Sequence, residues 1–200
     1  QITVVELSTL SNAGSGTSLS SSSFVQNRKK IKPEVFKYLS DIIVENYYQL
    51  EEDNLNLFYG FRLLAVDGSI LTLPNHKDLI KEFGVKTNQS NVISIQARAS
   101  VLYDVLNNFV IDSDLSSMNV TERDQALMFQ SYWQANDLII YDRGYPGFYF
   151  FKSHLQQSIN FLCRIKVNHN NVVVDFVNSK KKSAVVEWAP NHRKSSHRPD

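Results

Sequence analysis

The sequence is short of cysteine and of long apolar runs, and each shortage excludes a class of protein. A single cysteine, Cys163, among 200 residues excludes an internal disulfide framework and a zinc site built from several thiolates. No apolar run approaches the ~20 residues that a membrane-spanning helix needs. The first residues also lack the basic stretch and apolar segment of a secretory signal. We therefore expect a reducing, cytoplasmic location.

Charge is nearly balanced overall but not along the chain. With 42% hydrophobic and 20% charged residues, the chain can bury the core of one domain with an appendage. The formal net charge is +1, yet residues 1–142 carry 11 basic and 17 acidic side chains, whereas residues 143–200 carry 10 and 3. A local positive surface is a reason to consider nucleic acid as a partner. A solvated basic tail is the alternative interpretation.

The N-terminal part changes from serine-rich to helical. Residues 1–23 have the glycine and serine content of a flexible connector. Apolar residues then recur at helical spacing after Pro33, which predicts an amphipathic helix. Arg28, Lys29 and Lys30 precede this helix and are candidates for contacts with DNA phosphates. Such clusters are also common on solvated helix faces.

The rest of the chain predicts an α/β fold. We expect strands at 61–66, 70–73, 92–103, 109–111, 138–141 and 159–167, and helices at 122–134 and 146–157. Thr121 and Asp124 have the spacing of a capping box. This order predicts a mixed sheet with flanking helices, antiparallel at first and parallel where helices cross over. Towards the C-terminus we expect a valine-rich piece at 171–177, a short strand at 184–188 and a basic tail.

Two aspartates follow apolar strands and precede a glycine within two residues. One lies in the expected turn Asp67-Gly68-Ser69, and the other begins Asp142-Arg143-Gly144. If the two strands are parallel neighbours, their carboxyl ends meet at the place where open α/β sheets bind ligands. Paired carboxylates can hold Mg²⁺ or Mn²⁺ and support phosphodiester chemistry. The alternative is that each aspartate only caps a turn.

Three segments together resemble transposases of the insertion sequence 4 family. They are RLLAVDGSILTLP at 62–74, SVLYDVLNNFVIDSDLSS at 100–117 and DLIIYDRGYPGFYFFKSHL at 137–155. Upstream, SSSFVQNRKKIKPEVF at 21–36 is similar to the segment that precedes the core in that family. The resemblance implies a helical N-terminal segment at 1–57, an RNase H-like core at 58–166, and a β-rich insertion that begins at 167–200.

The resemblance also implies residue roles. Asp67 and Asp142 match the first and second acids of a triad that binds Mg²⁺ or Mn²⁺. Arg143 and Tyr145 lie in the matching YDRGY segment and are candidates for DNA contacts. The implied reaction cuts DNA at transposon ends and joins the freed 3′-hydroxyl to target DNA. The implied partners are double-stranded DNA and a second transposase subunit, at the nucleoid of a bacterial cell.

The third acid of the family does not occur in its usual pattern, which is Tyr, two residues, Arg, three residues, Glu, six residues, Lys. The one glutamate after Asp142 is Glu187, in a strand-like context, with Lys180 and Ser183 where the pattern has Tyr and Arg. We therefore expect a truncated transposase with little activity of its own, or a non-catalytic DNA-binding remnant. A haloacid-dehalogenase-type phosphatase is disfavoured, because Ala65 stands where that chemistry needs its nucleophilic aspartate.

Overall fold

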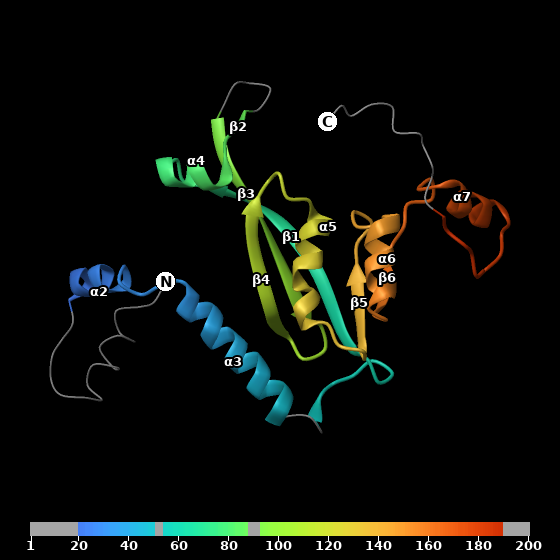
Figure 1. Cartoon of the computed structure of the whole chain (residues 1–200), viewed down its shortest axis with the longest axis horizontal. Helices are drawn as coiled ribbons and strands as arrows, with labels where there is room; N and C mark the ends of the chain where they lie inside the picture. The colour runs from blue at the N-terminus through green and yellow to red at the C-terminus, as the bar shows by residue number, and fades with distance from the viewer. Residues whose placement is uncertain (1–19, 51–53, 88–92, 190–200) are drawn as a thin grey trace. The chain divides into compact units, whose positions relative to one another are not determined.

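The computed structural model describes residues 20–50, 54–87 and 93–189. The chain divides into two units, 1–50 and 51–200, which are described separately (Figure 1). Among the described residues, no helix is both long enough and apolar enough to cross a membrane.

The first unit contains two helices, α2 (Ser21–Arg28) and α3 (Glu34–Leu50). Helix α3 confirms the helix that the apolar spacing predicts after Pro33. The Ser20 hydroxyl accepts a hydrogen bond from the Ser23 backbone N–H at 3.1 Å and so caps α2. The prediction of a flexible connector is therefore wrong for Ser21–Ser23, and residues 1–19 lie outside the described residues.

The second unit is built on a six-stranded sheet. Its strands are β1 (Arg62–Leu73), β2 (Lys86–Thr87), β3 (Ile93–Asp104), β4 (Phe109–Ser117), β5 (Asp137–Tyr141) and β6 (Asn160–Cys163). They lie in the order β2-β3-β1-β5-β6, and β4 pairs with β3. The α-helices are α4 (Lys77–Phe83), α5 (Glu122–Met128), α6 (Phe148–Gln156) and α7 (Asn171–Asn178), and a 3₁₀ helix (Phe129–Tyr132) follows α5.

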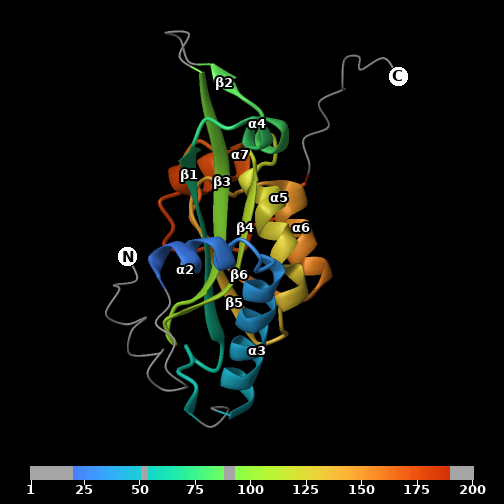
Figure 2. The same cartoon turned by 90° about the vertical axis from the view of Figure 1, so that its left-hand side faces the viewer.

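The direction of pairing changes at β1, the central strand. β1 and β4 are both antiparallel to β3, whereas β5 is parallel to β1 and to β6. Helices α5 and α6 precede and follow β5, and they cover the same face of the sheet (Figures 1 and 2). An antiparallel hairpin followed by helix-connected parallel strands confirms the predicted α/β, RNase H-like fold.

Strand β1 corrects one prediction near the candidate site. Asp67-Gly68-Ser69 was expected to form a turn, but these residues lie inside a continuous strand. Their partners on β3 are Val101, Ser100 and Ala99. Antiparallel pairing along the whole of β1 thus outweighs the local turn preference of the Asp-Gly sequence.

The C-terminal part of the described chain also differs from the expectation. The valine-rich piece forms helix α7, because the Asn170 side chain accepts a hydrogen bond from the Val173 backbone N–H at 2.9 Å and starts the helix. Residues 184–189 have no regular secondary structure, so the predicted strand at 184–188 is wrong. Trp188 in this segment packs its ring on Phe148 and Phe151 of α6.

The core of the second unit lies between the sheet and the two covering helices. Every second residue is buried in β5 and in the first half of β1, and Leu64, Leu102 and Ile139 are fully inaccessible. Phe129 and Phe150, from the helical segments on either side of β5, are at most 3% exposed. The core thus fixes the central strands that carry the candidate site.

Candidate active site

Asp67 lies in β1, and Asp142 directly follows β5, the parallel neighbour of β1. β1 and β5 pair from Arg62↔Asp137 to Ala65↔Ile140, so each β5 residue comes 75 positions after its β1 partner. Asp142 also comes 75 positions after Asp67, and each aspartate lies two residues beyond the last pair, Ala65↔Ile140. Neighbouring strands are about 4.8 Å apart, and residues two apart share a face of the sheet. The pairing therefore confirms that the two strands are parallel neighbours, as the interpretation of the aspartates requires.

Both carboxylates are available to a ligand. Asp67 and Asp142 are exposed, and within the described residues neither carboxylate makes a hydrogen bond or an ion pair. Their backbone carbonyls accept hydrogen bonds instead, from the Ser100 hydroxyl at 3.3 Å and from the Cys163 thiol at 3.6 Å. A held backbone with open carboxylate oxygens fits a hard cation such as Mg²⁺ or Mn²⁺.

A buried ion pair fixes the register five residues before each aspartate. Arg62 donates from Nε and Nη2 to the two carboxylate oxygens of Asp137, at 2.7 and 2.8 Å. The two side chains are 4% and 0% exposed. A slip of one residue would break this bidentate pair and move every side chain of the strand to the opposite face. The pair therefore supports the register of the two strands that lead to Asp67 and Asp142.

Tyr145, a predicted DNA contact, is part of the core. It is 2% exposed, and its ring packs on Tyr141 and Phe150 with centroid distances of 5.2 and 5.9 Å. Direct contact of this ring with DNA stays a prediction, and the burial of the ring does not favour it.

The Tyr145 hydroxyl lies among the charges of the site. Burial is the largest cause that raises the pKa of Tyr145, to about 12. The carboxylates of Glu122 and Asp67 raise it further. Arg98 lowers this pKa, and Asp142 raises it by a smaller amount. Glu122 and Arg98 are therefore electrostatic neighbours of the two aspartates.

Arg98 and Glu122 form an ion pair that the sequence does not reveal. Arg98 on β3 donates from Nη1 to Oε1 of Glu122, the first residue of α5. The capping box of α5 uses Thr121 and Asp124, as predicted. The sequence pattern therefore locates the start of the helix, but no spacing rule links residues 98 and 122.

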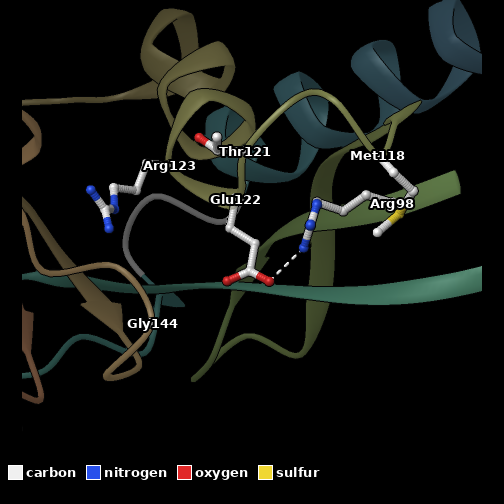
Figure 3. A pocket seen from close by; sticks show the side chains of 6 residues that line it. All are labelled: Arg98, Met118, Thr121, Glu122, Arg123 and Gly144. Carbon is white, nitrogen blue, oxygen red and sulfur yellow. Dashed lines mark hydrogen bonds and ion pairs between the residues drawn. The ribbon is translucent and has the colours of Figure 1, made fainter. Parts of the chain in front are cut away.

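A pocket of about 300 Å³ surrounds this ion pair (Figure 3). Its lining residues are Arg98, Met118, Thr121, Glu122, Arg123 and Gly144. The Glu122 side chain extends from α5 between Arg98 and the loop that bears Gly144 (Figure 3). A Cβ atom on Gly144 would lie 3.1 Å from Glu122 Oε2, so the carboxylate occupies the space that a side chain would need.

The remaining candidate residues are four exposed basic side chains and Glu187. Arg143 is exposed, as are Arg28, Lys29 and Lys30 in the first unit, and their DNA contacts stay predictions. Glu187 lies in the irregular segment beside Trp188, so its interpretation as a strand residue is wrong. In the described part of the chain, no three His, Cys, Asp or Glu side chains are grouped closely enough to hold a metal ion.

The sheet order, with Asp67 inside the central strand β1 and Asp142 directly after its parallel neighbour β5, defines an RNase H-like domain. Residues 59–194 match the family model described as the transposase DDE domain. The match covers more than half of the chain, and the chain belongs to this family. No protein in the curated set that was compared matches the chain.

Proposed function

We propose that residues 58–166 are the catalytic core of an insertion sequence 4-type transposase. It would cut DNA at the ends of an insertion sequence and join the freed ends to target DNA. Membership of the transposase DDE domain family supports the general class. The observation that supports the chemical proposal is the parallel register of β1 and β5, which relates Asp67 to Asp142 by the same offset as the paired residues. Neither carboxylate has a partner among the described residues.

In this proposal Asp67 and Asp142 hold a divalent cation. Bound Mg²⁺ or Mn²⁺ activates a water or a 3′-hydroxyl and stabilises the leaving oxygen of a phosphodiester. The protein would hold the two aspartates in place, because Ser100 and Cys163 donate hydrogen bonds to their backbone carbonyls. Their short side chains would then orient the bound cation. The negative charges of the two aspartates would also attract the cation to this site.

DNA binding would come from exposed cations. Arg143 follows Asp142 directly and has no ion-pair partner among the described residues, so its guanidinium suits a phosphate next to the cleaved bond. Arg28, Lys29 and Lys30 would add contacts with the DNA backbone that weaken as salt increases. We propose a homodimer as the active assembly, because each transposon has two ends to cut.

The described residues would supply two of the three acids of the family site, since no third acid is grouped with Asp67 and Asp142 there. The second candidate is a DNA-binding remnant without metal chemistry. A direct measurement of metal binding separates the two candidates, because only the first requires it.

The test is a calorimetric titration of Mn²⁺ into the 200-residue chain. We expect binding that Asp67→Asn and Asp142→Asn each weaken at least tenfold, because each change removes a charged ligand. Asp175→Asn, an exposed position on α7, is the matched control and should bind as the unmodified chain does. No Mn²⁺ binding, or equal losses in all three variants, would contradict the proposal and favour the DNA-binding remnant.

A further inference from the structure

We propose that Glu122 is a positioning residue. It would hold the Asp142 loop, residues 142–147, against the sheet and so keep Asp142 beside Asp67. The inference rests on the proposed metal-dependent function. The ion pair of Glu122, the closeness of its second carboxylate oxygen to Gly144 and the hydrogen bonds of its helix carry the proposal.

Helix α5 gives Glu122 a fixed base. Asp124 completes the capping box, so the Glu122 carboxylate is free to reach the sheet. One turn further on, buried Gln125 donates from Nε2 to the Arg98 carbonyl at 2.9 Å and to Asp114 Oδ2 at 2.7 Å. These bonds attach the first turns of α5 to β3 and β4. Movement of Glu122 relative to the sheet would break them.

The two oxygens of Glu122 face different parts of the site. Oε1 accepts the hydrogen bond from Arg98 on β3, the strand that pairs with β1 along its length. Oε2 faces Gly144 of the Asp142 loop (Figure 3). Gly144 is not in the left-handed backbone region, and a Cβ atom there would lie 3.1 Å from Oε2, so an alanine would require the carboxylate to shift slightly. One oxygen of the Glu122 carboxylate thus bonds to the sheet, and the other lies close to the loop.

Within the Asp142 loop, Asp142 and Tyr145 are linked by a hydrogen bond. The Tyr145 backbone N–H donates to the Asp142 carbonyl at 3.1 Å and closes the turn around Gly144. The buried Tyr145 ring anchors the far side of that turn in the core. A displacement of Gly144 away from Glu122 would therefore displace Asp142, and with it half of the proposed metal site.

Glu122 suits this supporting role better than the role of a metal ligand. Arg98, whose side chain is 15% exposed, already neutralises one of its oxygens. Glu122 is also not part of any described group of three metal-binding side chains. Residues that orient metal ligands from outside the coordination sphere typically change metal affinity 10- to 100-fold when they are replaced.

The test is the Mn²⁺ titration of the 200-residue chain with further variants. We expect Glu122→Ala to raise the Kd for Mn²⁺ about tenfold, and Glu122→Gln, which keeps the shape of the side chain, to raise it less. Gly144→Ala should also weaken binding, because its Cβ displaces the carboxylate. The double variant Glu122→Ala/Gly144→Ala should bind Mn²⁺ as Glu122→Ala does, because it no longer has the Glu122 carboxylate that the new Cβ would displace. Glu82→Gln, an exposed position on α4, is the matched control.

Several outcomes would overturn the inference. Mn²⁺ binding by Glu122→Ala equal to that of the unmodified chain would remove the positioning role. Loss of all detectable Mn²⁺ binding in Glu122→Ala would make Glu122 a ligand. Additive effects of Glu122→Ala and Gly144→Ala would show that the two sites act independently. If Glu122→Ala does not fold, unchanged binding by Gly144→Ala decides against the inference and weaker binding supports it.

The same titration separates this inference from the proposed function. If the unmodified chain binds no Mn²⁺, or if Asp67→Asn binds it equally well, both proposals are wrong. If binding depends on Asp67 but not on Glu122 or Gly144, only the positioning role is wrong.

Discussion

The buried pair Arg62–Asp137 gives the most direct test of what fixes the sheet register. Asp137→Asn keeps the size of the side chain but removes the carboxylate charge that pairs with the Arg62 guanidinium, whose side chain is 4% exposed. The Asp137 carboxylate accepts two hydrogen bonds from Arg62 and one from the Gln134 backbone N–H at 2.8 Å. Arg62 would retain its hydrogen bond to the Tyr132 carbonyl at 2.9 Å.

The expected cost is large for a single substitution. Removal of one partner from a buried ion pair typically destabilises a protein by about 3–5 kcal/mol. A domain has about 5–15 kcal/mol of stability in total, so Asp137→Asn would remove a large share of it. The double variant Arg62→Met/Asp137→Leu should recover most of the loss, because it leaves no unpaired buried charge.

Urea unfolding followed by circular dichroism measures these differences in the free energy of unfolding. Asp78→Asn is the matched control, because Asp78 is 77% exposed beside His76, and it should change stability by less than about 0.5 kcal/mol. A cost below about 1 kcal/mol for Asp137→Asn, the range of exposed pairs, would refute the argument that this pair holds the register. Failure of the double variant to recover would refute the explanation by an unpaired charge.

Two further predictions concern buried titratable groups. His154 donates from Nδ1 to a carbonyl of its own helix and accepts from the Tyr141 hydroxyl at 2.7 Å, and burial lowers the pKa of His154. Because the folded-state pKa lies below the unfolded value of about 6.5, the free energy of unfolding should fall as pH decreases from about 7 to 5. His154→Gln should reduce that slope, and an unchanged slope would contradict the assignment. Burial, with a smaller contribution from the Asp142 charge, raises the pKa of Cys163 from 9.0 to about 11. Its reaction with Ellman's reagent at pH 7.5 should therefore be about 100-fold slower than in the unfolded chain, and equal rates would show an accessible, ordinary thiol.

The sequence predicts the elements of this fold better than their extent. Alternation in β3 and the apolar run of β5 are local patterns, and both strands form where they are expected. The predicted turn at Asp67-Gly68 is wrong. Pairing with Val101 and Ser100 on β3, which are distant in sequence, extends β1 through these two residues. The valine-rich piece has strand-like composition, yet a cap from Asn170 starts a helix there.

The residues of the candidate site can likewise be found from the sequence only in part. Asp67 and Asp142 can be selected from sequence, because each follows an apolar run and because parallel strands of an open α/β sheet bind ligands beyond such runs. The Arg98–Glu122 pair cannot, because a residue inside a strand and a residue at a helix start meet only after α5 packs on β3. The burial of Tyr145 likewise depends on the packing of α6.

The central claim is that Asp67 and Asp142 share one metal site. The most direct test is a crystal structure of the chain grown with Mn²⁺, with the ion located by its anomalous scattering. We expect an anomalous peak coordinated by carboxylate oxygens of both aspartates. Carboxylates more than ~10 Å apart, too far for one pair of ions to bridge, or a peak bound elsewhere would contradict the claim.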